Sequence, residues 1–188
     1  MRLGFALWLK KVSMPFSSEV LHGAYYIPVS EGGKEVFLFP LHTEDAGKIE
    51  RWKTQTRVLL PGKMFGVVSG GMEKYQGRLE TLEETLQRES DEELHMFIAL
   101  WQITHALPDI KVQQVRNGQR KNILGHGAQV TLTERQVRRA KQKYGIDPLR
   151  VPIQDLSLFI NRHTALIRPS TSAALMLYLS QQGKQYAI

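Results

Sequence analysis

Residues Gly70 to Met96 read GGMEKYQGRLETLEETLQRESDEELHM, and this stretch is the most informative in the chain. Its second part, Thr81 to Leu94, is rich in Glu, Leu, Gln and Arg and contains neither Gly nor Pro, so it predicts a helix. Glu89, Glu92 and Glu93 stand at positions i, i+3 and i+4 of that helix and share one face. The stretch therefore predicts a helix that presents three carboxylates together.

The acidic face lies alongside the apolar stripe of the same helix, because the two arcs overlap on the helical wheel. The stripe consists of Leu79, Leu82, Leu86 and Leu94. Like charges at the margin of a core repel one another and lose hydration unless a cation compensates them. Mg²⁺, which prefers oxygen ligands, is the natural compensator. Arg88, four residues after Glu84 and four before Glu92, is placed to hold the cluster by ion pairs.

The spacing of these charges resembles the Nudix box of Nudix hydrolases, G-x5-E-x7-R-E-U-x-E-E-x-G-U, in which U is a bulky aliphatic residue. The charged positions match in register, and Met96 matches the final U. They are Glu80, Arg88, Glu89, Glu92 and Glu93.

Three positions depart from the box. Lys74 replaces its first glycine, and because the nearest glycines are Gly70 and Gly71, the loop before Glu80 is longer. Ser90 replaces an aliphatic residue. His95 replaces the glycine after the helix, where the backbone is expected to need a positive φ that His tolerates better than most residues.

The resemblance implies an α/β protein, a Nudix-like α/β/α sandwich with a mixed β-sheet and a C-terminal helical extension. It also implies an Mg²⁺-dependent hydrolase, with Mn²⁺ as an alternative metal, that cleaves a pyrophosphate bond in a nucleoside diphosphate linked to another moiety. By position, Glu89 and Glu93 would be metal ligands, and Glu92 a ligand or an aid in deprotonating the attacking water. Glu80 would orient the site, and Arg88 would hold the glutamates by ion pairs.

Three other interpretations stay open. The acidic cluster can be a solvated helix face, or the domain can be a catalytically weak Nudix-fold module that binds a nucleotide, RNA or a protein partner. A basic nucleic-acid-binding protein is the third, since residues 111–150 carry ten Lys and Arg against two acids. Within that region, a basic helix is predicted over Glu134 to Tyr144. The hairpin that carries Arg116, Arg120 and Lys121 is a candidate phosphate-binding site.

Composition limits the class of protein. The chain has 188 residues, 42% hydrophobic and 23% charged, with a formal charge of +7 and no cysteine. It therefore lacks the means for a disulfide scaffold, thiol catalysis or Cys-ligated metal. No apolar run is long enough for a membrane span, and a cytoplasmic protein is expected. We predict an N-terminal segment, residues 1–20, and one domain over residues 21–188. The protein is also a candidate for forming a homodimer. The six histidines show no metal-ligand spacing and are interpreted as structural or surface residues.

The remaining pattern predicts strands around the helix. Gly23 to Val29 and Glu35 to Pro40 flank a hairpin turn, and Ile110 to Val115 and Gln119 to Leu124 flank Asn117-Gly118. The apolar run Met96 to Ile103 predicts a buried strand. A last helix is expected from about residue 170 to 182.

Overall fold

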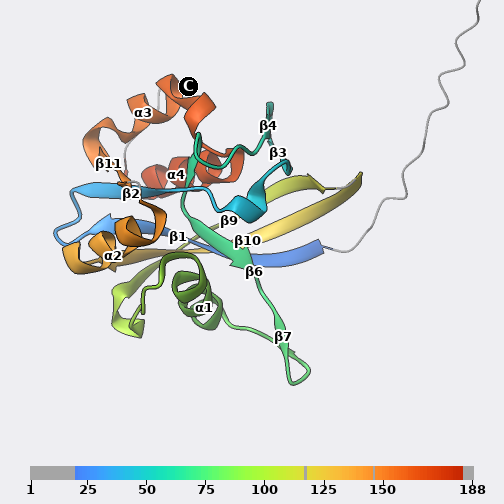
Figure 1. Ribbon diagram of the computed structural model, residues 1–188, viewed down its shortest axis with the longest axis horizontal. Helices are drawn as coiled ribbons and strands as arrows, with labels where there is room; N and C mark the ends of the chain where they lie inside the picture. The colour runs from blue at the N-terminus through green and yellow to red at the C-terminus, as the bar shows by residue number, and fades with distance from the viewer. Residues whose placement is uncertain (1–19, 117, 146, 184–188) are drawn as a thin grey trace, which may run out of the picture.

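The computed structural model describes residues 20–116, 118–145 and 147–183 (Figure 1). The strands are β1 Val20–Ser30, β2 Glu35–Pro40, β3 Ile49–Trp52, β4 Gln55–Val58, β5 Phe65–Gly66, β6 Val68–Gly71, β7 Lys74–Tyr75, β8 Arg78–Leu79, β9 Ile103–Arg116, β10 Gln119–Leu132 and β11 Leu149–Pro152. The helices are α1 Leu82–Leu94, α2 Glu134–Tyr144, α3 Leu156–Arg162 and α4 Pro169–Gln181. The predicted N-terminal segment, 1–20, lies outside the described residues except for Val20.

The main sheet is mixed, as expected. Its strands follow the order β11-β2-β1-β10-β9-β3-β4, with β5 beside β2 and β6 beside β1. β1 runs parallel to β10 over its whole length, from Val20↔Asn122 to Ser30↔Leu132. β9 and β10 form a long antiparallel hairpin, so the separately predicted strands of this region are parts of two continuous ones.

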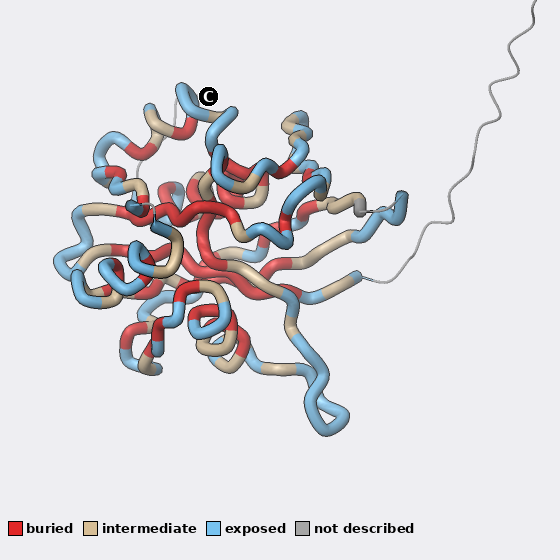
Figure 2. Tube along the Cα trace, in the orientation of Figure 1, coloured by how far each residue is buried: buried red, intermediate tan, exposed pale blue. Residues whose placement is uncertain are grey.

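Helices cover both faces of the sheet, which confirms the expected α/β/α layering (Figure 1). α1 lies below the sheet in this view, and α1 and α2 together bury Leu86, Leu94, Val137 and Ala140 in one apolar cluster with the strands. α3 and α4, the predicted C-terminal helices, cover the other face through a second apolar cluster. Figure 2 shows the buried residues concentrated in the central strands between these layers. None of the described helices combines the length and apolarity that crossing a bilayer requires.

The predicted strand Met96 to Ile103 was wrong. Residues 96–99 have no regular structure and a short 3₁₀ helix, Leu100–Gln102, precedes β9. Met96 and Ile98 are buried, whereas Phe97 and Trp101 are 71% and 75% exposed. Every residue of the run except Gln102 is apolar, but the run follows the end of α1 and reaches the sheet only at Ile103, so no element of the described residues covers Phe97 and Trp101.

Candidate active site

Helix α1 is fixed at its start by its own side chains. Thr81 is the N-cap, and its hydroxyl accepts a hydrogen bond from the Glu84 N–H at 3.2 Å, while the Glu84 carboxylate accepts from the Thr81 N–H at 2.8 Å. This capping box satisfies two backbone donors that a helix start leaves free. Arg78 donates to the Glu84 carboxylate as well, and it holds the pKa of that carboxyl low, at about 2. Glu84 therefore serves the helix start and does not pair with Arg88.

The two departures from the motif near the end of α1 are accommodated. His95 takes the left-handed conformation expected there, with φ 52° and ψ 40°, and its N–H caps the helix on the carbonyl oxygen of Asp91. Ser90 is buried. Its hydroxyl donates to the Leu86 carbonyl at 2.6 Å and lies 3.1 Å from the Tyr26 hydroxyl. A small polar residue here costs little, because its polar group is satisfied.

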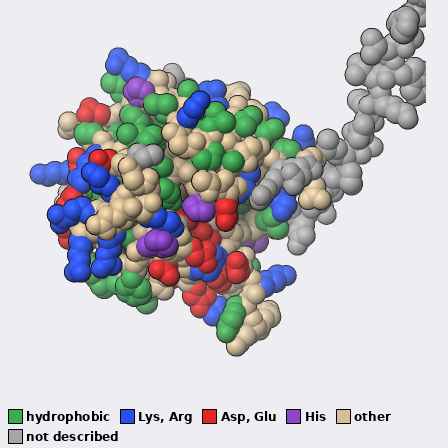
Figure 3. Space-filling model, viewed as in Figure 1, with side chains coloured by type: hydrophobic (Ala, Val, Ile, Leu, Met, Phe, Trp, Pro, Cys, Tyr) green, Lys and Arg blue, Asp and Glu red, His purple; other side chains and the backbone are tan. Residues whose placement is uncertain are grey.

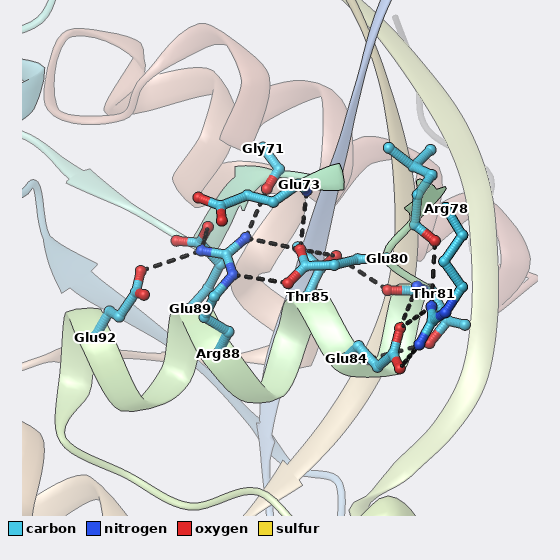
Figure 4. A network of polar contacts seen from close by, with 11 residues as sticks. Gly71, Glu73, Arg78, Glu80, Thr81, Glu84, Thr85, Arg88, Glu89 and Glu92 are labelled. Carbon is cyan, nitrogen blue, oxygen red and sulfur yellow. Dashed lines mark hydrogen bonds and ion pairs between the residues drawn. The ribbon is translucent and has the colours of Figure 1, made fainter. Parts of the chain in front are cut away.

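Arg88 lies at the centre of the acidic cluster (Figure 4). Its five N–H groups all have acceptors: both oxygens of Glu80 at 3.0 and 2.9 Å, Glu89 at 2.7 Å, Glu92 at 3.1 Å and the Gly71 carbonyl at 2.7 Å. The planar guanidinium offers that number of donors in a fixed fork, which lysine does not. Arg88 thus connects three of the glutamates that the motif predicts, and ties them to the strand β6.

Glu80 orients Arg88 from the loop before the helix. Its carboxylate also accepts hydrogen bonds from the Glu73 N–H at 3.0 Å and the Thr85 hydroxyl at 3.1 Å. Hydrogen bonding by Arg88 is the main reason that the pKa of Glu80 falls to about 2. The extra length of the loop is taken up by the hairpin β7–β8, which projects from the molecule and closes where the Glu80 N–H donates to the Glu73 carbonyl (Figure 1).

Glu89 passes directly over the backbone of Gly70. A Cβ atom added at Gly70 would lie 1.8 Å from the carboxyl carbon of Glu89, whereas one added at Gly71 would meet nothing within 4 Å. Only 8% of Glu89 is exposed. Burial raises its pKa above the ordinary value, and the charge of Arg88 offsets only part of that effect. The glycine before the loop therefore makes room for a buried carboxylate.

Glu93 lies one turn further along α1 and is half-buried. Within the described ranges, no hydrogen-bond donor reaches its carboxylate. Burial, and after it the charge of Glu89, raises the pKa of Glu93 to about 8. Its main chain is held by α2, since the Tyr144 hydroxyl donates to the Glu93 carbonyl at 2.8 Å and the Lys143 ammonium donates to the Glu92 carbonyl. The backbone is thus fixed while the carboxylate stays without a partner.

A buried arginine from the C-terminal layer stands close to this carboxylate. Arg168 pairs with Glu50 at 2.7 Å and with Asp45 at 3.3 Å, and its charge lowers the pKa of Glu93 while that of Asp45 raises it. Sequence reasoning missed this cluster. Arg168 and Glu50 are 118 residues apart in the chain, and neither lies in a local motif that marks it.

A cavity of about 580 Å³ opens beside the cluster. It is lined by Asp45, Glu50, Gly70, Gly71 and Arg168, and by three lysines, Lys48, Lys74 and Lys121. Of the predicted phosphate-binding residues, Lys121 therefore lines this cavity. Arg120, its neighbour in β10, points to the opposite face of the strand. The side chain of Arg116 lies outside the described part of the structure.

The carboxylates fit a hard divalent cation in part. In the described residues, no three His, Asp or Glu side chains converge closely enough to hold a metal ion as they stand. Glu89 and Glu93 nevertheless have the chemistry for one, because burial destabilises each of them as an anion. Glu92 accepts from Arg88, as Glu89 does, but its side chain is 58% exposed and keeps more of its hydration. Glu89 and Glu93 are thus the strongest ligand candidates.

Two of the histidines form a chain of hydrogen bonds outside this cluster. The Nδ1 atom of His22 lies 2.9 Å from Nε2 of His126, whose Nδ1 lies 2.9 Å from Asp109. His42 caps a 3₁₀ turn through its Nδ1, and His95 ends α1.

No protein-family model and no curated protein matches this sequence, but solved structures match its fold. The MutT protein from Methanosarcina mazei Go1 has a TM-score of 0.54 at 11% identity, over 91% of this chain and 100% of that one. A NUDIX hydrolase from Nitrosomonas europaea has 0.49 at 12% identity, over 89% and 97%. A mutT/nudix family protein from Listeria innocua has 0.49 at 13%, over 87% and 94%. The assignment rests on the first, whose TM-score exceeds 0.5. With this backbone, and with the motif of residues 70–96 carried on α1, the chain has the Nudix fold.

Proposed function

We propose that the protein is a divalent-metal-dependent hydrolase that cleaves a pyrophosphate bond in a nucleoside diphosphate linked to another moiety. The observation that carries the proposal is the pair Glu89 and Glu93: two carboxylates one turn apart that repel each other, with Glu89 lying over Gly70, a residue of the cavity wall. Arg88 and Glu80 fix the helix on which they stand. Lysines in the cavity wall, Lys48, Lys74 and Lys121, suit the phosphates of such a substrate.

Each group then has a defined part. Glu89 and Glu93 would hold Mg²⁺ or Mn²⁺, which polarises the phosphoryl group and acidifies water when bound. Arg88 and Glu80 are positioning residues, because they act on the carboxylates and do not face the cavity as free groups. Glu92, which is exposed at the same face, is placed to accept a proton.

The test is hydrolysis by the purified protein of nucleoside diphosphate derivatives, dinucleoside polyphosphates, capped RNA and nucleoside triphosphates, with Mg²⁺, with Mn²⁺ and with chelator. Glu89→Gln and Glu93→Gln should each lower the rate by roughly 100-fold or more. Glu83→Gln is the matched control, since Glu83 is an exposed acid of the same helix without an ion pair in the described residues. Equal rates for Glu93→Gln and Glu83→Gln would refute the proposed site.

A second candidate, a catalytically weak module that binds a nucleotide, RNA or a protein, is favoured by one observation. Arg88 binds the carboxylates of Glu80, Glu89 and Glu92, so among the motif's glutamates in the described residues only Glu93 keeps a carboxylate without a donor. This candidate predicts nucleotide binding that survives Glu93→Gln, with no turnover in any metal.

A further inference from the structure

Three large apolar side chains stand out of the surface between α1 and β9. The exposed fractions of Phe97, Leu100 and Trp101 are 71%, 61% and 75%. A single exposed apolar residue is ordinary, but three large ones within five residues of one segment are a feature of interaction surfaces. We call Phe97, Leu100 and Trp101 the apolar patch.

The segment that carries the apolar patch is held firmly. Met96, Ile98 and Gln102 alternate with it and are buried. The Gln102 amide donates to the Thr131 carbonyl at 2.7 Å, and Gln87 donates to the Ile98 carbonyl at 2.9 Å. The segment is therefore anchored before, within and after the apolar patch by Met96, Ile98 and Gln102.

The basic helix α2 borders the apolar patch. Gln136 donates to the Phe97 carbonyl at 2.8 Å, and Lys143, two turns later on the same face, donates to the Glu92 carbonyl. Arg139 lies between these two contacts, and Arg135 precedes it by one turn. Both arginines are exposed, and neither forms an ion pair within the part of the chain that is described. Figure 3 shows Lys and Arg side chains gathered at the left of the molecule, directly above hydrophobic ones.

We propose that the apolar patch, flanked by Arg135 and Arg139, docks the protein on an anionic membrane surface. A protruding Phe, Leu and Trp set beside cations is the composition of interfacial anchors, in which apolar groups enter the acyl boundary and cations meet the headgroups. None of the three lines the cavity beside the acidic cluster, so the apolar patch is separate from the proposed active site. Single-stranded RNA fits less well, because Leu100, between the two aromatic rings, offers no face for a base to stack on.

The test is flotation of the full chain with vesicles of phosphatidylcholine alone and of equal parts phosphatidylcholine and phosphatidylserine. We expect binding to the anionic vesicles only, weakened by added salt. The triple variant Phe97→Ser, Leu100→Ser, Trp101→Ser should lose at least about tenfold in partitioning. Arg135→Glu and Arg139→Glu should each lose about fivefold. Trp101→Ser alone, with a smaller expected loss, covers the case in which the triple variant does not fold.

The matched controls carry the same changes elsewhere on the surface. Tyr75→Ser removes an aromatic side chain that is 63% exposed on β7, and Lys111→Glu reverses an exposed charge on β9. Both should bind vesicles as the parent does. Unchanged binding of the triple variant and of Trp101→Ser would overturn the proposal. So would retention of a single-stranded RNA, or a concentration-dependent dimer, that the patch variants abolish while vesicles bind none of the proteins.

Discussion

Gly70→Ala tests the geometry of the site most directly. The added methyl carbon would stand 1.8 Å from the carboxyl carbon and from one oxygen of Glu89, and 2.3 Å from the other oxygen. Ordinary contact begins near 3.4 Å, so the carboxylate must move by roughly 1.5 Å. Such a move breaks its 2.7 Å hydrogen bond from Arg88. We expect a loss of about 1–3 kcal/mol in the free energy of unfolding, from overpacking and the broken charged contact.

Gly71→Ala is the matched control. A Cβ atom at Gly71 meets nothing within 4 Å, and neither glycine has a positive φ, so the two variants differ only in what the methyl group meets. The measurement is urea denaturation of both variants and of Gly70→Ala combined with Glu89→Ala. The second change removes the clashing group, so the two changes together should destabilise less than the sum of each alone. If Gly70→Ala were as stable as Gly71→Ala, the Glu89 carboxylate would not lie over the backbone of Gly70.

Gly70→Ala also tests whether the proposed reaction depends on the position of the Glu89 carboxylate as well as on its charge. A shift of about 1 Å in a reacting group costs on the order of 100-fold in rate. Gly70→Ala should therefore lower pyrophosphate hydrolysis by roughly that factor, although every glutamate of the motif is still present. Activity equal to that of Gly71→Ala would mean that Glu89 has no part in turnover.

Three other changes test the surroundings of the site. Glu50→Gln should cost about 3–5 kcal/mol in urea denaturation, because it removes the closer of the two carboxylates that pair with the buried Arg168 charge. Burial alone would raise the pKa of Glu50, but Arg168 holds it near 2, below its ordinary 4.5. The ionised Glu50 carboxylate therefore stabilises the fold fully above about pH 4.5, and this stabilisation is lost as the pH falls toward 2. In acid titrations the unfolding free energy of the parent should drop in that window, and Glu50→Gln should show a smaller drop. His95→Gly should raise the thermal midpoint by an amount equivalent to roughly 0.5–1 kcal/mol, because glycine adopts the φ of 52° without strain. A lower midpoint would show that the contact between the His95 ring and the Asp91 carbonyl stabilises the fold by more than the backbone strain costs. Arg88→Lys should keep the fold by circular dichroism yet lower activity at least tenfold, because one ammonium donates fewer hydrogen bonds to Glu80 and its neighbours; full activity would argue against a positioning role.

The sequence was sufficient for α1 because its signals are local. The spacing of Glu89 and Glu93, the fork of Arg88 and the left-handed end at His95 all follow from helical geometry within one segment. The basic helix was predictable for the same reason. Thr133 and Gly145 mark its ends, and α2 has the predicted bounds.

The parts that were missed depend on contacts between distant residues. The apolar run at 96–103 has the composition of a buried strand, and only its place after α1 leaves Phe97 and Trp101 without a cover. No residue pattern near Asp45 or Glu50 predicts that both carboxylates will pair with Arg168. Such long-range pairs depend on how the layers pack together, and the periodicity of hydrophobic residues in the sequence does not predict that packing.

The C-terminal layer, which matches nothing in the motif, nevertheless supports the wall of the cavity. Glu50 accepts hydrogen bonds from Arg168, from Gln114 in β9 and from the Ser170 N–H at the start of α4. Arg168 also pairs with Asp45, at the end of a 3₁₀ turn that lines the cavity, and Asp45 pairs in turn with Lys48. One buried guanidinium thus ties α4 to β3 and to the loop before it. Because burying that charge is costly unless all its partners are in place, the loop and the start of α4 must form together. The cavity wall that contains Asp45 and Glu50 therefore depends on the last helix for its structure.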